Sequence, residues 1–253
     1  MLSQDYIMPL LGGRLGNNLF MIAHALAKGF EYNKQVVVYR PHVIYHGNDY
    51  SQNIFRGLEF IDSYKDNRNY NLNVPSDDKP TYYFGYYQSE SCFENYSEEI
   101  KRLFGPPEEF VERINNELPF LNEKIVTLIN VRRGDYLHSP NYHPTVTPEY
   151  IYKALEQISN TEMFLIASDD IEWCKENFKG DKFIFVENEK DYIELYLMSM
   201  CSNNITSNSS FSWWGAWLNQ NKTKTVVGPK NWFGPSLQSL KTDDIIPNNW
   251  IKI

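Results

Sequence analysis

Cysteine is scarce in this chain and its spacing is irregular. The three cysteines, Cys92, Cys174 and Cys201, are odd in number and far apart. This excludes a disulfide framework and a metal-binding pair of the CxxC type, so we expect three reduced thiols. The first twenty residues also lack both a long apolar run and a basic cluster, which excludes a secretory signal and a membrane span by pattern. A cytoplasmic location is the prediction that follows.

Positive charge is in deficit. The chain has 24 Lys and Arg against 32 Asp and Glu, a formal net charge of −8, and an isoelectric point near 5.2. Sequence-independent nucleic-acid binding needs a broad positive field, so this class of function is excluded, and any phosphate site must be local. With 42% hydrophobic residues, the chain can still form substantial cores.

The amino-terminal part has the pattern of strand, glycine turn, helix and strand. An apolar run over 6–11 leads into Gly12 and Gly13, apolar residues then recur at helical spacing, and the run QVVVY over 35–39 is compact and β-branched. This predicts a βαβ unit. Residues 40–80 are polar and without a period, which indicates long loops containing short elements.

The carboxy-terminal part alternates strands and helices. Strands are expected at 125–131, 163–167, 182–186, 204–206 and 225–228, with helices between them. The pattern predicts a doubly wound parallel sheet, with ligands at the carboxyl ends of its strands. We therefore expect an α/β protein with two Rossmann-like lobes facing a central cleft, residues 1–120 and 121–253.

Two adjacent arginines follow the expected strand 125–131, in the sequence Asn130-Val131-Arg132-Arg133-Gly134-Asp135-Tyr136. Guanidinium groups keep their charge and bind phosphate oxygens in bidentate fashion, so this pair could hold a diphosphate without a metal ion. A surface ion pair with Asp135 explains the same residues equally well.

Two other strand ends carry polar turns. Ser207 to Ser212 passes from a short strand into a helix, where hydroxyls and main-chain N–H groups can bind an anion, although a serine N-cap is the simpler interpretation. Asp169 and Asp170 end the strand 163–167. We expect one to cap the next helix and the other to accept hydrogen bonds from a ribose or a guanine. Being adjacent, they are poorly placed to chelate a metal together.

Several stretches in chain order resemble those of one family. NVRRGDY resembles the donor-binding His-x-Arg-Arg-x-Asp element of α-1,2- and α-1,6-fucosyltransferases, and GGRLGNNLF is similar to their amino-terminal loop. Further similarity lies in GYYQSESCF from Gly85, IASDDIEWCKENF from Ile166, SNSSFSWWGAWL from Ser207 and GPKNWF from Gly228. The chain resembles the bacterial α-1,2-fucosyltransferases, which form glycosyltransferase family 11.

The resemblance implies a GT-B fold and inverting transfer of L-fucose from GDP-β-L-fucose to the 2-hydroxyl of a terminal galactoside, with no metal or other cofactor. The catalytic residues it implies are Arg132, Arg133, Asn17 and Asp135. The donor-binding residues it implies are Gly13, Gly16, Asn130, Asp169, Asp170, Ser209, Ser210 and Phe211. Asn130 stands where the family usually has His, and Asn18 where it usually has Gln.

The general base and the acceptor site stay open. Asp135, Glu90 and His143 could each serve as the base. Tyr86, Gln88 and His143 are candidates for binding the acceptor, a galactose-terminated oligosaccharide or a lipid-linked glycan. A lipid-linked acceptor would bring the protein into peripheral contact with the inner face of the plasma membrane.

Two other classes of function compete. An oxidoreductase is suggested by the strand-GGRLGN-helix turn, but the G-x-G-x-x-G order is missing. Tyr39 and Arg40 replace the ribose-binding acid, which leaves only an NADP-dependent version. A non-catalytic glycan-binding protein on the same fold is the second alternative.

Overall fold

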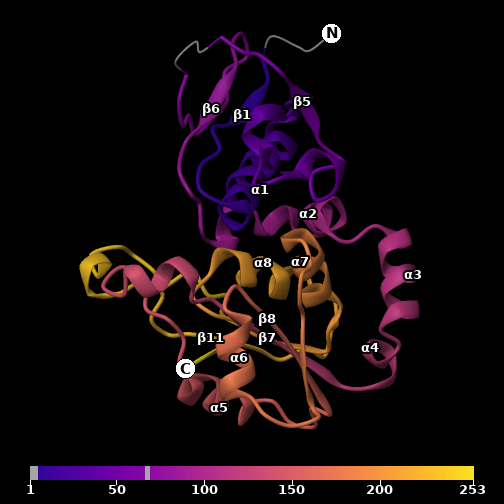
Figure 1. Ribbon diagram of the computed structural model, residues 1–253. Helices are drawn as coiled ribbons and strands as arrows, with labels where there is room; N and C mark the ends of the chain where they lie inside the picture. The colour runs from indigo at the N-terminus through magenta and orange to yellow at the C-terminus, as the bar shows by residue number, and fades with distance from the viewer. Residues whose placement is uncertain (1–4, 66–68) are drawn as a thin grey trace. The chain divides into compact units, whose positions relative to one another are not determined.

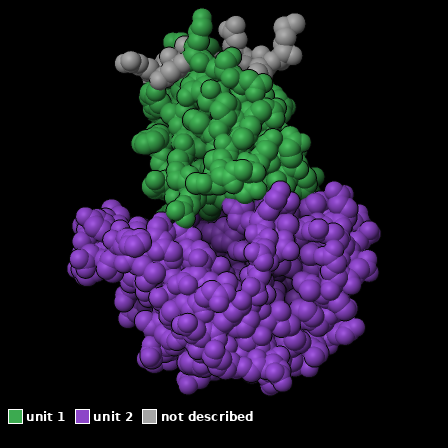
Figure 2. All heavy atoms as spheres, in the orientation of Figure 1, with its two compact units in different colours: residues 1–105 green, residues 106–253 purple. Residues whose placement is uncertain are grey.

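The computed structural model describes residues 5–65 and 69–253, and its contacts divide the chain into two compact units, residues 1–105 and 106–253 (Figure 2). The division falls ahead of the boundary expected at 120, because the helices after Pro106 pack with the second unit. Which unit serves the donor and which the acceptor stays a prediction.

The amino-terminal unit is a small parallel α/β layer. Its elements are β1 (Ile7–Pro9), α1 (Leu15–Tyr32), β2 (Val37–Tyr39), β3 (Ile44–Tyr45), β4 (Asn48–Asp49), β5 (Glu59–Ile61), β6 (Thr81–Tyr83) and α2 (Ser97–Phe104). Strand β1 pairs with β6 and β2 with β5, both in parallel, and a bridge from Ile7 to Val36 joins the two pairs. The predicted βαβ opening is therefore present, and the stretch 40–80 contains only short elements where the structure describes it.

Helix α1 is the central element of this unit. Its apolar residues are buried on nearly every face, since loops and 3₁₀ turns cover the sides that the sheet does not. It ends at Asn33, whose left-handed φ of 51° lets its N–H bond back to the last turn. A helix covered in this way holds its first residues, 15–18, in fixed positions.

The carboxy-terminal unit contains the larger sheet. Its elements are α3 (Glu108–Glu117), α4 (Phe120–Glu123), β7 (Val126–Val131), α5 (Pro148–Leu155), β8 (Met163–Ser168), α6 (Ile171–Asn177), β9 (Phe183–Phe185), α7 (Asp191–Met200), β10 (Asn203–Ile205), α8 (Ser210–Leu218), β11 (Val226–Gly228) and β12 (Ile251–Lys252). The strand order is β12-β11-β10-β7-β8-β9, and every pairing is parallel (Figure 1). The doubly wound prediction is confirmed.

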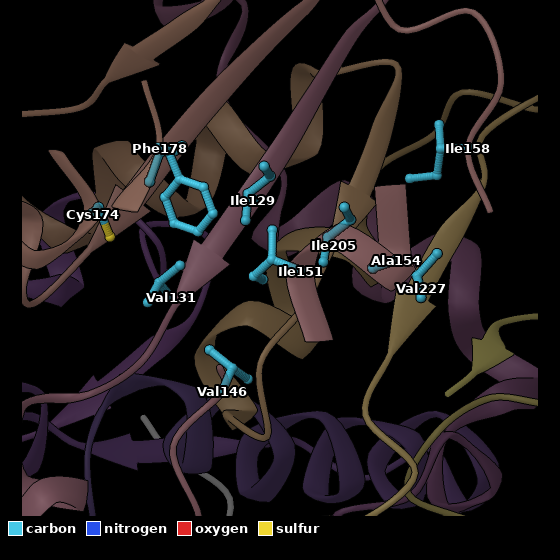
Figure 3. Close-up of a cluster of buried hydrophobic side chains, with 11 residues drawn as sticks. Ile129, Val131, Val146, Ile151, Ala154, Ile158, Cys174, Phe178, Ile205 and Val227 are labelled. Atoms are coloured by element: carbon cyan, nitrogen blue, oxygen red, sulfur yellow. The ribbon is translucent and has the colours of Figure 1, made fainter. Parts of the chain in front are cut away.

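One core lies against this sheet between β7, β10 and the helices α5 and α6. Ile129 and Val131 from β7 meet Ile151 from α5 and Phe178 from the end of α6, all nearly inaccessible to solvent (Figure 3). Burying such side chains stabilises by about 1.5–3 kcal/mol each, so the strand before the two arginines is firmly anchored. Over the described residues, no helix has both the length and the apolar character needed to cross a bilayer.

Candidate donor-binding site

The carboxyl ends of β7, β8 and β10 lie next to one another in the carboxy-terminal sheet. Arg132 and Arg133 follow β7, Asp169 and Asp170 follow β8, and the serine turn follows β10. Parallel strands deliver all their following loops to the same edge, where open α/β sheets bind ligands. The three motifs that the sequence analysis selected in this unit are thus brought together.

Arg132 lies between two carboxylates. Its Nη2 donates to Asp135, three residues on, and its Nη1 to Asp169 Oδ2 at 2.8 Å. The guanidinium also lies over the ring of Tyr136, 5.3 Å from the ring centroid. The ion pair with Asp135 that the sequence offered as an alternative is therefore present. A guanidinium has five N–H donors, more than these two contacts use.

Arg133 is held more rigidly. Its Nε donates to Asp170 Oδ2 at 2.9 Å, and its guanidinium stacks on the ring of Trp173 at 4.0 Å from the centroid. Its main-chain N–H donates to Asp169 Oδ1 at 2.8 Å. A charge fixed by an ion pair and an aromatic face does not have to reorganise when a ligand arrives.

The two aspartates divide their roles only partly as expected. Asp170 caps α6, accepting from the N–H of Trp173 at 3.4 Å, as one of the pair was predicted to do. The other, Asp169, was expected to be available to a ribose or a guanine. Both of its oxygens accept hydrogen bonds from Arg132 and Arg133, and each carboxylate oxygen keeps a second lone pair, so its role toward a ribose or a guanine stays a prediction.

Asn130, which replaces the histidine usual in related sequences, is buried between strands. Its Oδ1 accepts from the hydroxyl of Ser207 at 3.0 Å, and its Nδ2 lies 3.4 Å from the carbonyl of Ala167. An imidazole could make a similar pair of contacts only in one tautomer. Asn130 thus ties β7 to the serine turn rather than facing solvent.

The serine turn leads into α8 at Ser210. Ser209 occupies the N-cap position, yet its side chain makes no capping bond. The serine cap that the sequence predicted is therefore not formed by this side chain, and the start of α8 lies at the ligand edge of the sheet, where helix N-termini bind anions. Trp213 and Trp214 are fully buried, as expected for core residues. Phe211, in the first turn, is partly exposed.

A second layer of aromatic contacts closes one side of the site. Tyr136 donates its hydroxyl to the carbonyl of Asn208 at 3.2 Å, and its ring stacks on His143 with the centroids 4.7 Å apart. Burial lowers the pKa of His143, and Arg132 lowers it further, while Asp135 acts in the opposite direction. The lowered pKa favours the neutral form of the His143 imidazole, which can accept a proton.

Glu194 was missed by sequence reasoning. It lies on the inner part of α7, where burial chiefly, and then Asp191, Asp169 and Glu189, raise its pKa to about 8. A carboxyl with this pKa is largely protonated at neutral pH and can donate a hydrogen bond. The available signal was an acid that directly precedes the apolar run of α7, in which Leu195, Tyr196, Leu197 and Met198 are buried.

The remaining candidates lie in the amino-terminal unit. Gly13 has a φ of 79° in the turn before α1, and Gly16 is buried in the first turn of that helix. Asn17 accepts a hydrogen bond at Oδ1 from Gln88 Nε2 at 2.8 Å. Tyr86 is exposed in the loop after β6. The structure thus joins Gln88 to Asn17, residues that the sequence assigned to different roles.

Glu90 and Asn18 also lie in the amino-terminal unit. Glu90 opens a 3₁₀ turn over Glu90–Cys92 in the same unit. Asn18, which stands where related sequences usually have Gln, is buried in α1 and donates to the hydroxyl of Tyr45 at 3.2 Å. In the described parts of the chain, no three His, Cys, Asp or Glu side chains are grouped so that they could hold a metal ion.

Comparison with known proteins places these motifs in a wider context. The profile of the family described as "Glycosyl transferase family 11" matches residues 7–253. The O-antigen biosynthesis glycosyltransferase WbnK of Escherichia coli is 32% identical over 185 residues, 67% of this chain and 60% of WbnK. An alpha-1,2-colitosyltransferase of Escherichia coli is 31% identical over 186 residues, 68% of this chain and 62% of that protein. The chain thus spans about three fifths of the length of these two relatives.

A solved structure agrees with the fold. The α-1,6-fucosyltransferase NodZ, in crystals soaked with GDP-fucose, superposes with a TM-score of 0.54 at 14% identity, over 85% of this chain and 93% of NodZ. At this identity the likeness concerns the fold alone. The GT-B-like α/β fold that the sequence predicts is confirmed.

Proposed function

The chain belongs to glycosyl transferase family 11, and from this premise we propose that it transfers L-fucose from GDP-β-L-fucose to the 2-hydroxyl of a terminal galactoside, with inversion and without a metal ion. The biological acceptor would be an oligosaccharide or a lipid-linked glycan of a bacterial surface polysaccharide. The relatives named for O-antigen biosynthesis and for alpha-1,2-colitosyl transfer support the acceptor class and the linkage.

One observation carries the proposal. Two guanidinium groups and the start of α8 lie on adjacent strand ends, at the edge where a diphosphate would bind. When the sugar leaves, negative charge builds on the β-phosphate, and fixed positive groups there lower the barrier. We assign Arg132 and Arg133 to this role, and Ser209, Ser210 and Phe211 to the pocket for the diphosphate and the sugar.

The local charge requires an exchange of partners. Two arginines face three aspartates, so a diphosphate would meet net negative charge if every ion pair persisted. Asp135 is the carboxylate best able to leave, because its side chain is 53% exposed while those of Asp169 and Asp170 are 27% and 29% exposed. We therefore propose that the donor replaces Asp135 on Arg132.

The same contacts explain how the reaction could proceed without a metal ion. Asp169 and Asp170, the adjacent acids at the site, are both engaged by arginines and so are poorly disposed to bind Mg²⁺. Arginine supplies the positive charge that a cation would otherwise provide. Asn17, from the amino-terminal unit, is assigned to the reacting sugar. Asp135, Glu90 and His143 remain alternative bases.

The test combines binding and turnover. GDP binding raises the melting temperature by mass action, so we expect a shift with GDP that EDTA does not change. Radiolabelled GDP-fucose should transfer to galactosides, and Arg132→Ala should slow this by about 10²-fold or more. The matched control is Arg102→Ala, on the exposed face of α2. Turnover that strictly needs Mg²⁺ or Mn²⁺, or a folded Arg132→Ala enzyme near wild-type rate, would overturn the assignment.

The sugar itself needs a direct comparison, because one relative is named as a colitosyltransferase. Fucose and colitose donors should be assayed in parallel on the same galactoside, and faster transfer of colitose would reassign the donor. Binding of galactosides with no transfer from either donor would favour the glycan-binding alternative. Flotation with anionic vesicles tests the peripheral membrane contact.

A further inference from the structure

The loop after β6 has an unusual backbone. Gly85 has a φ of 145° and Tyr87 a φ of 50°, so an aromatic residue occupies the left-handed region that side chains with a Cβ disfavour. Such a conformation persists only where the surroundings hold it, and it often marks a functional segment. The loop follows β6, which pairs with β1. The carboxyl end of β1 leads to Gly13 and α1.

The surroundings of Tyr87 supply that constraint. Its hydroxyl donates to Asn71 Oδ1 at 3.0 Å, and Asn71 also bonds to both main-chain groups of Phe84. Its ring stacks on His24 of α1, with centroids 3.9 Å apart and planes 11° apart. Tyr87 is thus fixed at both its phenol and its ring, and the direction of the following residue is set.

That following residue is Gln88, which points at α1. Its Nε2 donates to Asn17 Oδ1 at 2.8 Å across 71 residues of sequence. With its oxygen engaged, the Asn17 amide turns its nitrogen toward Gly13, and a Cβ at Gly13 would overlap that nitrogen. The glycine therefore leaves room for the amide beside the turn, and the hydrogen bond from Gln88 selects the orientation of that amide.

We infer that Gln88 is a positioning residue, which fixes the Asn17 amide so that its nitrogen, rather than its oxygen, is directed along the Gly13 turn. This inference rests on the proposed function, in which Asn17 acts on the reacting sugar. It replaces direct acceptor binding as the role of Gln88. The strained Tyr87 belongs to the same arrangement, because its ring stacks on His24 and the next residue, Gln88, contacts Asn17.

The decisive variant is Gln88→Glu, which keeps the shape but presents only acceptor oxygens to Asn17. Asn17 must then turn its nitrogen toward the introduced carboxylate, and the Gly13 side receives the oxygen instead. We expect kcat to fall about 10-fold or more, because small misplacements of catalytic groups cost that much, while KM for the acceptor and the shift with GDP stay within about twofold. Gln238→Glu, at an exposed position, is the matched control.

A double-mutant cycle separates positioning from structure. If Gln88 acts only through Asn17, the variant with both Asn17→Ala and Gln88→Ala should be no slower than Asn17→Ala alone. Additive losses, an effect of Gln88→Glu confined to acceptor KM, or an unchanged kcat would each overturn the role. A wild-type protein that neither binds GDP nor transfers sugar would instead refute the proposed function, and this inference with it.

Discussion

Because His24 is buried, we expect the stability of the amino-terminal unit to fall as the pH drops below 7. The residue is 9% exposed, and its ring stacks on Tyr87 and makes an edge contact with Tyr83. Burial lowers the pKa of His24 to about 4, a main-chain hydrogen bond at Cys92 opposes this, and Lys28 adds slightly to the lowering. Glu31, the other charged group facing the ring, acts in the raising direction.

The sign follows from proton binding. Between a pKa of 6.5 in the unfolded chain and about 4 in the folded one, the unfolded state binds more protons. The free energy of unfolding therefore falls as pH drops through this window. The whole pKa shift corresponds to about 3 kcal/mol in the free energy of unfolding. Of this, about 2 kcal/mol is lost between pH 7 and pH 5.

Urea unfolding measured at pH 7, 6 and 5 on the wild type and on His24→Gln checks this value. Glutamine can donate to the Cys92 carbonyl but does not titrate, and the carboxylates common to both proteins cancel in the difference. The wild type should lose about 2 kcal/mol more than the variant between pH 7 and pH 5. Parallel pH profiles would show that the buried imidazole is not held neutral, and the reasoning from burial would fail.

Three other expectations concern the sites directly. Because the pKa of Glu194 is raised to about 8, its contribution to stability should decline as pH rises from 4.5 to 8, and Glu194→Gln should flatten that part of the unfolding profile. Asp135→Asn should bind GDP several-fold more tightly by calorimetry, since it weakens the hold on Arg132; weaker binding would contradict the exchange of partners. Gly13→Ala should lower kcat about 10-fold or more, because a Cβ there strains a positive φ and displaces the amide of Asn17. A folded Gly13→Ala enzyme with wild-type kcat would remove the steric argument.

The carboxy-terminal unit was the more predictable half, because its strands are continuous apolar runs and its helices have clear ends. The strand expected at 125–131 is β7 over Val126–Val131, and the helix expected after the serine turn begins at Ser210. In the amino-terminal unit, strand β6 ends at Tyr83. Gly85 and Tyr87 turn the chain there, held by Asn71 and His24, which are remote in sequence and therefore invisible to a local pattern.

Parts of the candidate site were equally beyond the sequence. The sequence alone shows that Arg132 and Arg133 are adjacent and predicts that they follow a strand. Their partners cannot, since the engagement of Asp169 by both arginines depends on β7 and β8 lying side by side. The protonated state expected of Glu194 likewise depends on burial, which arises only when α7 packs into the folded unit.

By itself the sequence determined the α/β class, the alternation of elements and the family, because these depend on apolar periodicity and on short motifs that are local in the chain. Tertiary structure alone decided which groups touch: the carboxylates on Arg132 and Arg133, and Gln88 on Asn17. Hydrogen bonds act over about 3 Å, and residues tens of positions apart meet at that distance only after the sheets have formed.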